Sequence, residues 1–253
     1  MDEQYMGGNQ FGEVADCQYH VEVAIVMDAT GSMSPIIDEV KKNAMDFCKK
    51  FTEKMEAVGK QVAALRVKVV PFRDFAYDGD KSLEQSKFFN LPEENEAFRN
   101  YVEQIQAFGG GDEPENALEA IAVAMRSDWT TEKIPGIKRR HVILVFTDAS
   151  AAPLKDASKP DKSKCSRIEN STYPENMPSS LAELSDMWEG ISQDLGGMPE
   201  KRSKRIVLFV PNSQPWNEIV WNQSWQNFSK AGKGLDDVSI EQTLEMLVGS
   251  MGD

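Results

Sequence analysis

Short apolar runs alternate along this chain with longer segments in which apolar side chains recur every three or four positions. Short runs rich in apolar and β-branched residues are typical of buried strands, and a three- to four-residue period is typical of an amphipathic helix. The short runs predict strands over residues 21–27, 65–72, 86–91, 141–147 and 205–211. The periodic segments predict helices over residues 34–55, 95–108, 114–126, 181–195, 216–228 and 240–251.

Strands that alternate with helices predict an α/β fold. We expect a Rossmann-like three-layer sandwich, in which a central, mostly parallel β-sheet carries helices on both faces. The run at 86–91 is expected to pair with 65–72 as one antiparallel edge strand. The polar, Gly-rich residues 1–18 are expected to form a flexible N-terminal tail. Residues 19–253 are expected to form a single domain, with 149–179 as a long loop insertion.

The composition excludes several classes of partner. The 253 residues include 28 Lys or Arg and 41 Asp or Glu, so the formal net charge is −13. Such an acidic chain repels phosphate groups, so we expect neither nucleic acid nor an anionic membrane surface as a partner. Three scattered Cys residues suit a reducing compartment, and neither a signal peptide nor an apolar run of ~18 residues is recognisable. These features predict a cytoplasmic protein.

Oxygen-bearing side chains stand at alternate positions where the first predicted strand ends. Asp28 follows the apolar run, and Thr30 and Ser32 come next. Alternate side chains of a tight loop can point to one side, and carboxylate and hydroxyl oxygens suit a hard divalent cation such as Mg²⁺. No nearby Cys or His offers the softer ligands that Zn²⁺ or Cu²⁺ favours. The pattern predicts a Mg²⁺ site that Mn²⁺ or Ca²⁺ could also occupy.

Two further carboxylates are expected at the same place. Asp112 follows the glycines 109–111, and Asp148 follows the strand predicted at 141–147. In parallel sheets, ligands bind outside the carboxyl ends of the strands, near the topological switch point. Because Asp28 and Asp148 both lie just past strand ends, we expect them to share one edge of the sheet.

With these three motifs in this order, the chain resembles the von Willebrand factor type A domain from its first strand to its final helix. The metal-ion-dependent adhesion site of that family has an Asp-x-Ser-x-Ser motif, a Thr from a Gly-Gly loop and an Asp after the central strand. Here Asp28-x-Thr30-x-Ser32 keeps both hydroxyls of the first motif, and Asp148 supplies the third. Asp112 stands where the family has the Thr. The end of the chain resembles the terminal helix of intracellular bacterial members.

The resemblance implies a role for each of these residues. Thr30 and Ser32 would contact Mg²⁺ directly, and Asp28 and Asp148 would act mostly through water. The chain would be a Mg²⁺-dependent protein-binding module rather than an enzyme, with the metal bridging to an acidic or other oxygen ligand of a protein partner. The partner is expected in a bacterial stress-response or signalling assembly. As a third carboxylate, Asp112 would hold the metal at least as tightly and attract an acidic partner less.

Two other interpretations stay open. Asp112 could cap a helix that begins at Glu113, with Glu115 reaching back as its capping-box partner. Asp28 and Thr30 after an apolar strand also resemble the aspartyl-phosphate loop of haloacid-dehalogenase-like Mg²⁺-dependent phosphatases and phosphotransferases, where the Asp is the nucleophile. Thr30 stands where those enzymes have a second Asp, which counts against that alternative.

Overall fold

The computed structural model describes residues 18–35, 37–75, 77–111, 113–154, 173–199, 203–219, 226–227, 244–245 and 248–249. Within these ranges, one sheet has the strand order β3-β2-β1-β4-β5-β6. Its strands are β1 (Gln18–Asp28), β2 (Gln61–Phe72), β3 (Phe89–Leu91), β4 (Ile137–Phe146), β5 (Lys204–Phe209) and β6 (Gln226–Asn227). Strand β3 runs antiparallel to β2, and the other neighbouring strands are parallel. The predicted mostly parallel sheet with one antiparallel edge strand is therefore confirmed.

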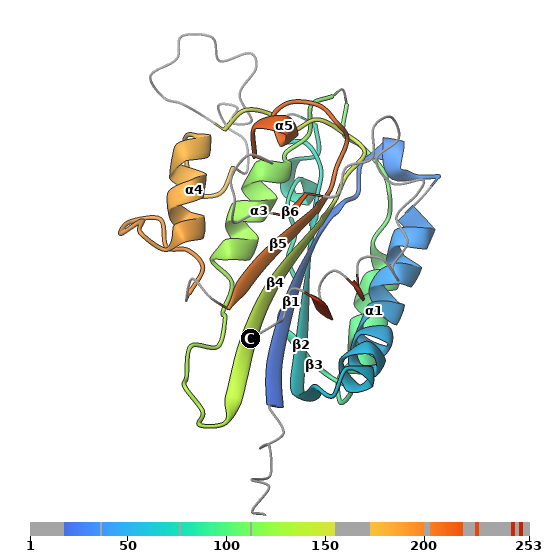
Figure 1. Ribbon diagram of the computed structural model, residues 1–253. Coiled ribbons are helices and arrows are strands. Elements are labelled where there is room, and N and C mark those ends of the chain that lie inside the picture. The colour runs from blue at the N-terminus through green and yellow to red at the C-terminus, as the bar shows by residue number, and fades with distance from the viewer. Residues whose placement is uncertain are drawn as a thin grey trace, which may run out of the picture.

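Helices cover both faces of this sheet, as the three-layer prediction requires. Figure 1 shows α1 (Ile37–Ala57) on one side and α3 (Ala117–Met125) and α4 (Leu181–Glu189) on the other. Helix α2 (Asn95–Gln104) packs with α1, and the short α5 (Trp216–Ile219) follows the end of β5. None of the helices in the described ranges is long and apolar enough to cross a membrane.

The core lies on both faces of the sheet because successive side chains of a strand point to opposite sides. In β1, the side chains of Val23 and Ile25 enter the core under α1 and α2, and those of Ala24 and Val26 enter the core under α3 and α4. All four side chains are fully buried. A strand segment buried on both faces has no solvent-facing position, which explains why residues 23–27 of β1 appear in the sequence as a continuous apolar run.

Several elements end earlier than their patterns predict. Helix α2 ends at Gln104 rather than 108, because Ile105 adopts an extended backbone. Helix α4 ends at Glu189 rather than 195, where Gly190 has the left-handed conformation that commonly terminates helices. The helix predicted over 216–228 is confirmed at residues 216–219 and was wrong at residues 226–227, which form β6; the rest of that segment lies outside the described residues.

Parts of other predictions lie outside the described residues. These are residues 1–17 of the predicted tail, residues 155–172 of the predicted loop and most of the predicted helix over 240–251. The four described residues of that last segment are helical, and Leu244 and Val248 pack into the core under α1. Gln18, which was assigned to the tail, is the first residue of β1. The division of the chain into a tail and a single domain stays a prediction.

Candidate metal centre

The candidate site lies where the chain leaves β1 and β4, at the switch point of the sheet. These strands are neighbours, but the chain continues from β1 to β2 on one side and from β4 to β5 on the other. Connections that diverge in this way leave a crevice outside the carboxyl ends of the two strands. Met27 pairs with Phe146, so the residues that follow each of them meet at the edge.

A chain of oxygen atoms links the two strand ends. Asp28 Oδ1 accepts hydrogen bonds from the backbone N–H of Thr30 (2.9 Å) and from Thr30 Oγ1 (2.7 Å). Thr30 Oγ1 lies 3.1 Å from Ser32 Oγ, which donates to Asp148 Oδ1 over 3.0 Å. The structure thus brings Asp28, Thr30, Ser32 and Asp148 together, and the expectation that the two Asp residues share one edge is confirmed.

Thr147 completes this arrangement from the side of β4. Its Oγ1 donates to Asp28 Oδ2 over 2.6 Å and accepts from the backbone N–H of Ala149 over 3.1 Å. Both carboxylate oxygens of Asp28 are therefore held by hydroxyl groups. Because Asp28 and Thr147 are completely buried, these bonds fix the position of the Asp28 carboxylate.

Burial sets the electrostatics of the two Asp residues. Burial raises the pKa of Asp28 to about 6, although the hydroxyls of Thr147 and Thr30 act in the opposite direction. Burial also raises the pKa of Asp148, against the effect of the Ser32 hydroxyl. A raised carboxyl pKa means that the negative charge is poorly compensated by its surroundings. A bound cation would supply that compensation.

The glycine loop, residues 109–111, packs against the first motif, residues 28–32. The N–H of Gly31 donates to Gly109 O over 3.1 Å, and the N–H of Gly110 donates to Asp78 Oδ2 over 2.9 Å. Gly110 has a φ of +86°, and a Cβ added to it would lie 2.7 Å from Thr30 Cβ and 2.7 Å from Glu115 Oε1. The backbone can approach Thr30 this closely because Gly110 has no side chain.

Replacing Gly110 with Ala is expected to lower the free energy of unfolding by about 2 kcal/mol, because the new methyl group would displace Thr30 or Glu115. Gly59→Ala is the matched control. Gly59 has a similar φ of +72°, but a Cβ there has no neighbour within 4 Å. We expect a loss of about 1 kcal/mol for the control, from backbone strain alone. Urea unfolding of both variants measures the difference, and equal losses would contradict the steric argument.

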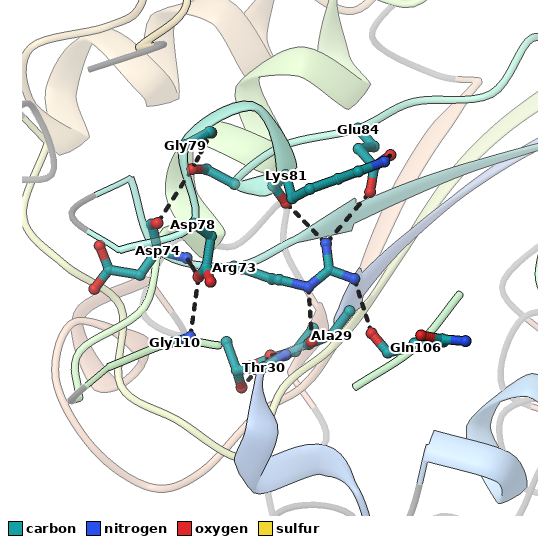
Figure 2. A network of polar contacts seen from close by, with 12 residues as sticks. Ala29, Thr30, Arg73, Asp74, Asp78, Gly79, Lys81, Glu84, Gln106 and Gly110 are labelled. Carbon is teal, nitrogen blue, oxygen red and sulfur yellow. Dashed lines mark hydrogen bonds and ion pairs between the residues drawn. The ribbon is translucent and has the colours of Figure 1, made fainter. Parts of the chain in front are cut away.

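Arg73 anchors the loops behind the site. Figure 2 shows its guanidinium between three segments, and it donates to the backbone carbonyls of Ala29 (3.0 Å), Lys81 (2.8 Å) and Gln106 (2.8 Å). It also forms an ion pair with Glu84 over 3.3 Å. These bonds connect the turn after β1 to the segment that leads into the glycine loop.

A comparison with protein-family models gives one match, to the von Willebrand factor A domain, over residues 22–167. The matched segment covers more than half of the chain, from β1 past the end of β4, and includes every strand end of the candidate site. The chain belongs to the von Willebrand factor A domain family. This A domain also has the α/β architecture that the resemblance predicted.

Among solved structures, this A domain is similar to proximal thread matrix protein 1 from the mussel byssus, described with a zinc-occupied MIDAS motif. The identity is 12% and the TM-score 0.47, over 93% of this chain and 47% of that one. The pilus adhesin SpaC from Lactobacillus rhamnosus GG shows 14% identity and a TM-score of 0.40, over 56% of this chain and 16% of the adhesin. This A domain thus spans less than half the length of either structure, and likenesses this distant carry no functional conclusion. No curated protein matches it.

The phosphatase alternative finds no support. The family match is to A domains, and Asp28 is fully buried with both carboxylate oxygens already accepting hydrogen bonds from Thr30 and Thr147. A carboxylate nucleophile needs an oxygen that can reach its substrate.

Asp112 lies outside the described residues, so its proposed contact with the metal stays a prediction. The helix expected to begin near it starts at Ala117, with Asn116 at the N-cap position. The capping-box interpretation was therefore wrong for this helix. Asn116 Oδ1 accepts instead from the backbone N–H of Phe75 over 2.7 Å. Glu115 precedes the helix, and its side chain extends toward Gly110 and Thr30.

Sequence reasoning missed three acidic residues of this edge. Asp74 and Asp78 follow β2, the strand beside β1, and Asp78 Oδ2 also accepts from the N–H of Asp74 over 3.1 Å (Figure 2). The rule that predicted Asp28 at a strand end would have identified Asp74 as well. Glu115 was considered only as a capping residue. Burial, followed by the charges of Asp28 and the other nearby carboxylates, raises the pKa of Glu115 to about 9.

The donor chemistry at this edge fits a hard divalent cation. Among the residues that the structure describes, no group of three or more His, Cys, Asp or Glu could hold a metal ion by itself. A Mg²⁺ site does not need such a group, because it takes hydroxyl, carboxylate and water oxygens in combination. Two hydroxyls between two carboxylates with uncompensated charge, from Asp28 to Asp148, meet that requirement.

Proposed function

We propose that this chain is a protein-binding module whose binding depends on a divalent cation, Mg²⁺ with Mn²⁺ or Ca²⁺ able to replace it. The observation that carries the proposal is the continuous series of oxygen atoms from Asp28 through Thr30 and Ser32 to Asp148 at the switch point of the sheet. Membership of the A domain family supports it. When bound, the cation supplies a coordination position that an oxygen atom of a protein partner can fill.

The hydrogen bonds of the two hydroxyls prepare them as ligands. Thr30 Oγ1 donates its hydrogen to Asp28, and Ser32 Oγ donates its hydrogen to Asp148. A hydroxyl whose hydrogen is engaged in this way keeps lone pairs available for a cation. Thr30 and Ser32 would therefore be direct ligands, and Asp28 and Asp148 would contribute charge, mostly through water. Ser32 is exposed while Thr30 is buried, so the site opens to a partner on the side of Ser32.

The surface beside the site suits a protein partner. Tyr77 is 60% exposed and Phe108 is 42% exposed, and both are large hydrophobic side chains. Tyr77 lies against Gly111 of the glycine loop. The Arg73 guanidinium lies over the Phe108 ring, with Arg73 Cζ 4.0 Å from the centre of the ring. Exposed aromatic residues that rim a polar site are typical of protein interaction surfaces. The net charge of −13 disfavours nucleic acid and anionic membranes as partners. We propose a protein partner in a cytoplasmic, bacterial stress-response or signalling assembly.

The test is cation binding by Ser32→Ala, measured by calorimetry with Mg²⁺ and Mn²⁺. Loss of one direct ligand is expected to weaken the affinity at least tenfold, about 1.4 kcal/mol. Ser34→Ala is the matched control, because Ser34 is also exposed and lies two residues further along. Its affinity is expected to equal that of the wild type. A partner captured by the immobilised wild type should be released by a chelator. A wild-type chain that binds neither cation would refute the proposal.

A further inference from the structure

Negative charge is concentrated at the edge of the sheet that carries the candidate metal centre. The carboxylates whose charges act on one another there follow β1, β2 and β4 or precede α3; they are Asp28, Asp74, Asp78, Glu113, Glu115 and Asp148. The described residues between β1 and α1, between α2 and α3, and from β4 to Leu154 include no Lys or Arg. Within residues 73–84, after β2, the two cations are Arg73 and Lys81, and both form ion pairs with Glu84. Both cations are therefore engaged by a seventh carboxylate.

The buried carboxylate of Glu115 shows that positive charge is missing at this edge. Glu115 is 5% exposed, and its Oε1 and Thr30 Cβ each lie 2.7 Å from the position that a Cβ on Gly110 would occupy, so its side chain is directed into the cluster. Its Oε2 has no hydrogen-bond partner within the part of the chain that the structure describes. Buried oxygens without a partner are rare in native proteins. A single divalent cation adds two positive charges and leaves most of the negative charge of the six carboxylates uncompensated.

Two exposed aromatic rings stand on either side of the glycine loop. Tyr77 follows β2 and lies against Gly111, and Phe108 directly precedes the loop. Because Arg73 is 2% exposed and Phe108 is 42% exposed, the Arg73 guanidinium covers the inner face of the Phe108 ring and leaves its outer side to solvent. The face of an aromatic ring attracts Lys and Arg side chains. Exposed rings beside uncompensated carboxylates therefore favour positively charged side chains on the partner.

We propose that the protein partner presents a basic segment to this edge, in which an oxygen ligand for the cation is flanked by Lys or Arg side chains. These flanking side chains contact the rings of Tyr77 and Phe108 and pair with exposed carboxylates such as Glu113, whose charge acts on Asp148. This inference rests on the proposed function, because it specifies the chemistry of the partner at the same site. An acidic partner surface would instead place carboxylates against carboxylates, and a single contact with the cation would have to offset that repulsion.

Two labelled peptides of equal length serve as probes, each with one central Asp as the oxygen ligand. One peptide has Lys and Arg on both sides of the Asp, and the other has Glu in those places. Fluorescence anisotropy with the full chain measures their binding in Mg²⁺ at about 0.15 M salt, where charges more than about 8 Å apart are largely screened. We expect the basic peptide to bind about tenfold more tightly than the acidic one. A chelator should weaken its binding, because its Asp then faces carboxylates without the cation.

A matched pair of variants separates the local charge from the overall charge of the chain. Glu113→Gln and Glu56→Gln each remove one negative charge from an exposed position, but Glu56 lies about 28 Å along α1 from Ile37, the end of the helix near the site. We expect Glu113→Gln to weaken binding of the basic peptide about threefold and Glu56→Gln to leave it unchanged. Tyr77→Leu keeps an apolar side chain without a ring, so it should also weaken the basic peptide about threefold while Mg²⁺ affinity by calorimetry stays the same.

Several results would overturn the inference. One is an acidic peptide that binds in Mg²⁺ as tightly as the basic peptide. Another is an equal effect of Glu113→Gln and Glu56→Gln, which would mean that the basic peptide responds only to the net charge of the chain. A third is a chain that binds Mg²⁺ but neither peptide. In each of these cases the proposed function still stands if Ser32→Ala weakens cation binding, whereas a wild type that binds no divalent cation would refute both.

Discussion

Replacing Arg73 with Met is expected to lower the free energy of unfolding by about 3–5 kcal/mol. The guanidinium is 2% exposed, and Met would fill much of its volume without any donor. The backbone carbonyls of Ala29, Lys81 and Gln106 would lose this donor, and the Ala29 carbonyl is buried. The carboxylate of Glu84 would lose the guanidinium and keep its ion pair with Lys81. A buried acceptor left without a donor costs more than the bond itself contributes, because its contact with water is not restored.

Urea unfolding at neutral pH measures this loss. Arg99→Met is the control, because Arg99 is exposed on α2 and the same substitution there should change the free energy of unfolding by less than about 0.5 kcal/mol. Arg73 also connects Ala29 to Gln106, so Mn²⁺ affinity should fall in Arg73→Met under conditions where the variant is folded. A variant as stable as the control would show that the carbonyls find other donors.

A second large effect is expected within β1, six residues before Asp28, where Glu22→Gln should lose about 3 kcal/mol of stability at pH 7. Glu22 is buried, which raises its pKa. The contacts with His141 (3.2 Å), with the hydroxyl and N–H of Thr130 (2.7 and 2.8 Å) and with Arg66 outweigh burial and lower the pKa to about 2. The ionised carboxylate is therefore much more stable in the folded protein than in the unfolded chain.

The pH dependence of this effect has a definite sign. Because the pKa of Glu22 falls from 4.5 in the unfolded chain to about 2 in the folded protein, its contribution is complete above pH 4.5 and is lost as the pH falls toward 2. Urea unfolding should show a difference between wild type and Glu22→Gln at pH 3 that is less than half of that at pH 7. Glu39→Gln, at an exposed position of α1, should show no such trend. An equal loss at both pH values would contradict the assignment.

Mn²⁺ binding distinguishes the role of Glu22 from that of the candidate metal centre. Glu22 and Asp28 lie six residues apart on β1, which is about 20 Å along an extended strand. Glu22→Gln should therefore leave cation affinity unchanged while it lowers stability. Ser32→Ala should instead lower cation affinity and leave stability unchanged, because it removes one exposed hydroxyl and no core contact.

The strands that carry the site were predictable because both are buried on two faces. β1 and β4 have no solvent-facing position near their carboxyl ends, so each appears there as an unbroken apolar run, and Asp28 and Asp148 are the first carboxylates after those runs. The ligand pattern of Asp28, Thr30 and Ser32 is local, since a three-residue turn connects them. Such features depend on neighbours along the chain and are therefore visible in the sequence.

Glu115 was not predictable in the same way. Its spacing from Asp112 matches a capping box, a local pattern, and nothing adjacent in sequence indicates that its side chain extends toward Thr30. That direction depends on the backbone bonds of Glu115 to Ser150 and Ala152, on a segment that follows a different strand. Asp74 could have been predicted from its place after β2, but its proximity to the glycine loop depends on Asp78 and Gly110.

By itself, the sequence determined the α/β alternation, the positions of the two central strands and the hydroxyl and carboxylate oxygens that follow them, because apolar periodicity reflects burial and turns bring near neighbours together. Only the tertiary structure decided which acidic side chains meet around those oxygens and which are turned elsewhere. The physical reason is that long-range bonds, such as those of Arg73 to Ala29 and of Glu115 to Ser150, set the paths of the loops. The acceptors in those bonds are backbone carbonyls, which every residue carries, so the side-chain pattern does not encode which carbonyl is reached.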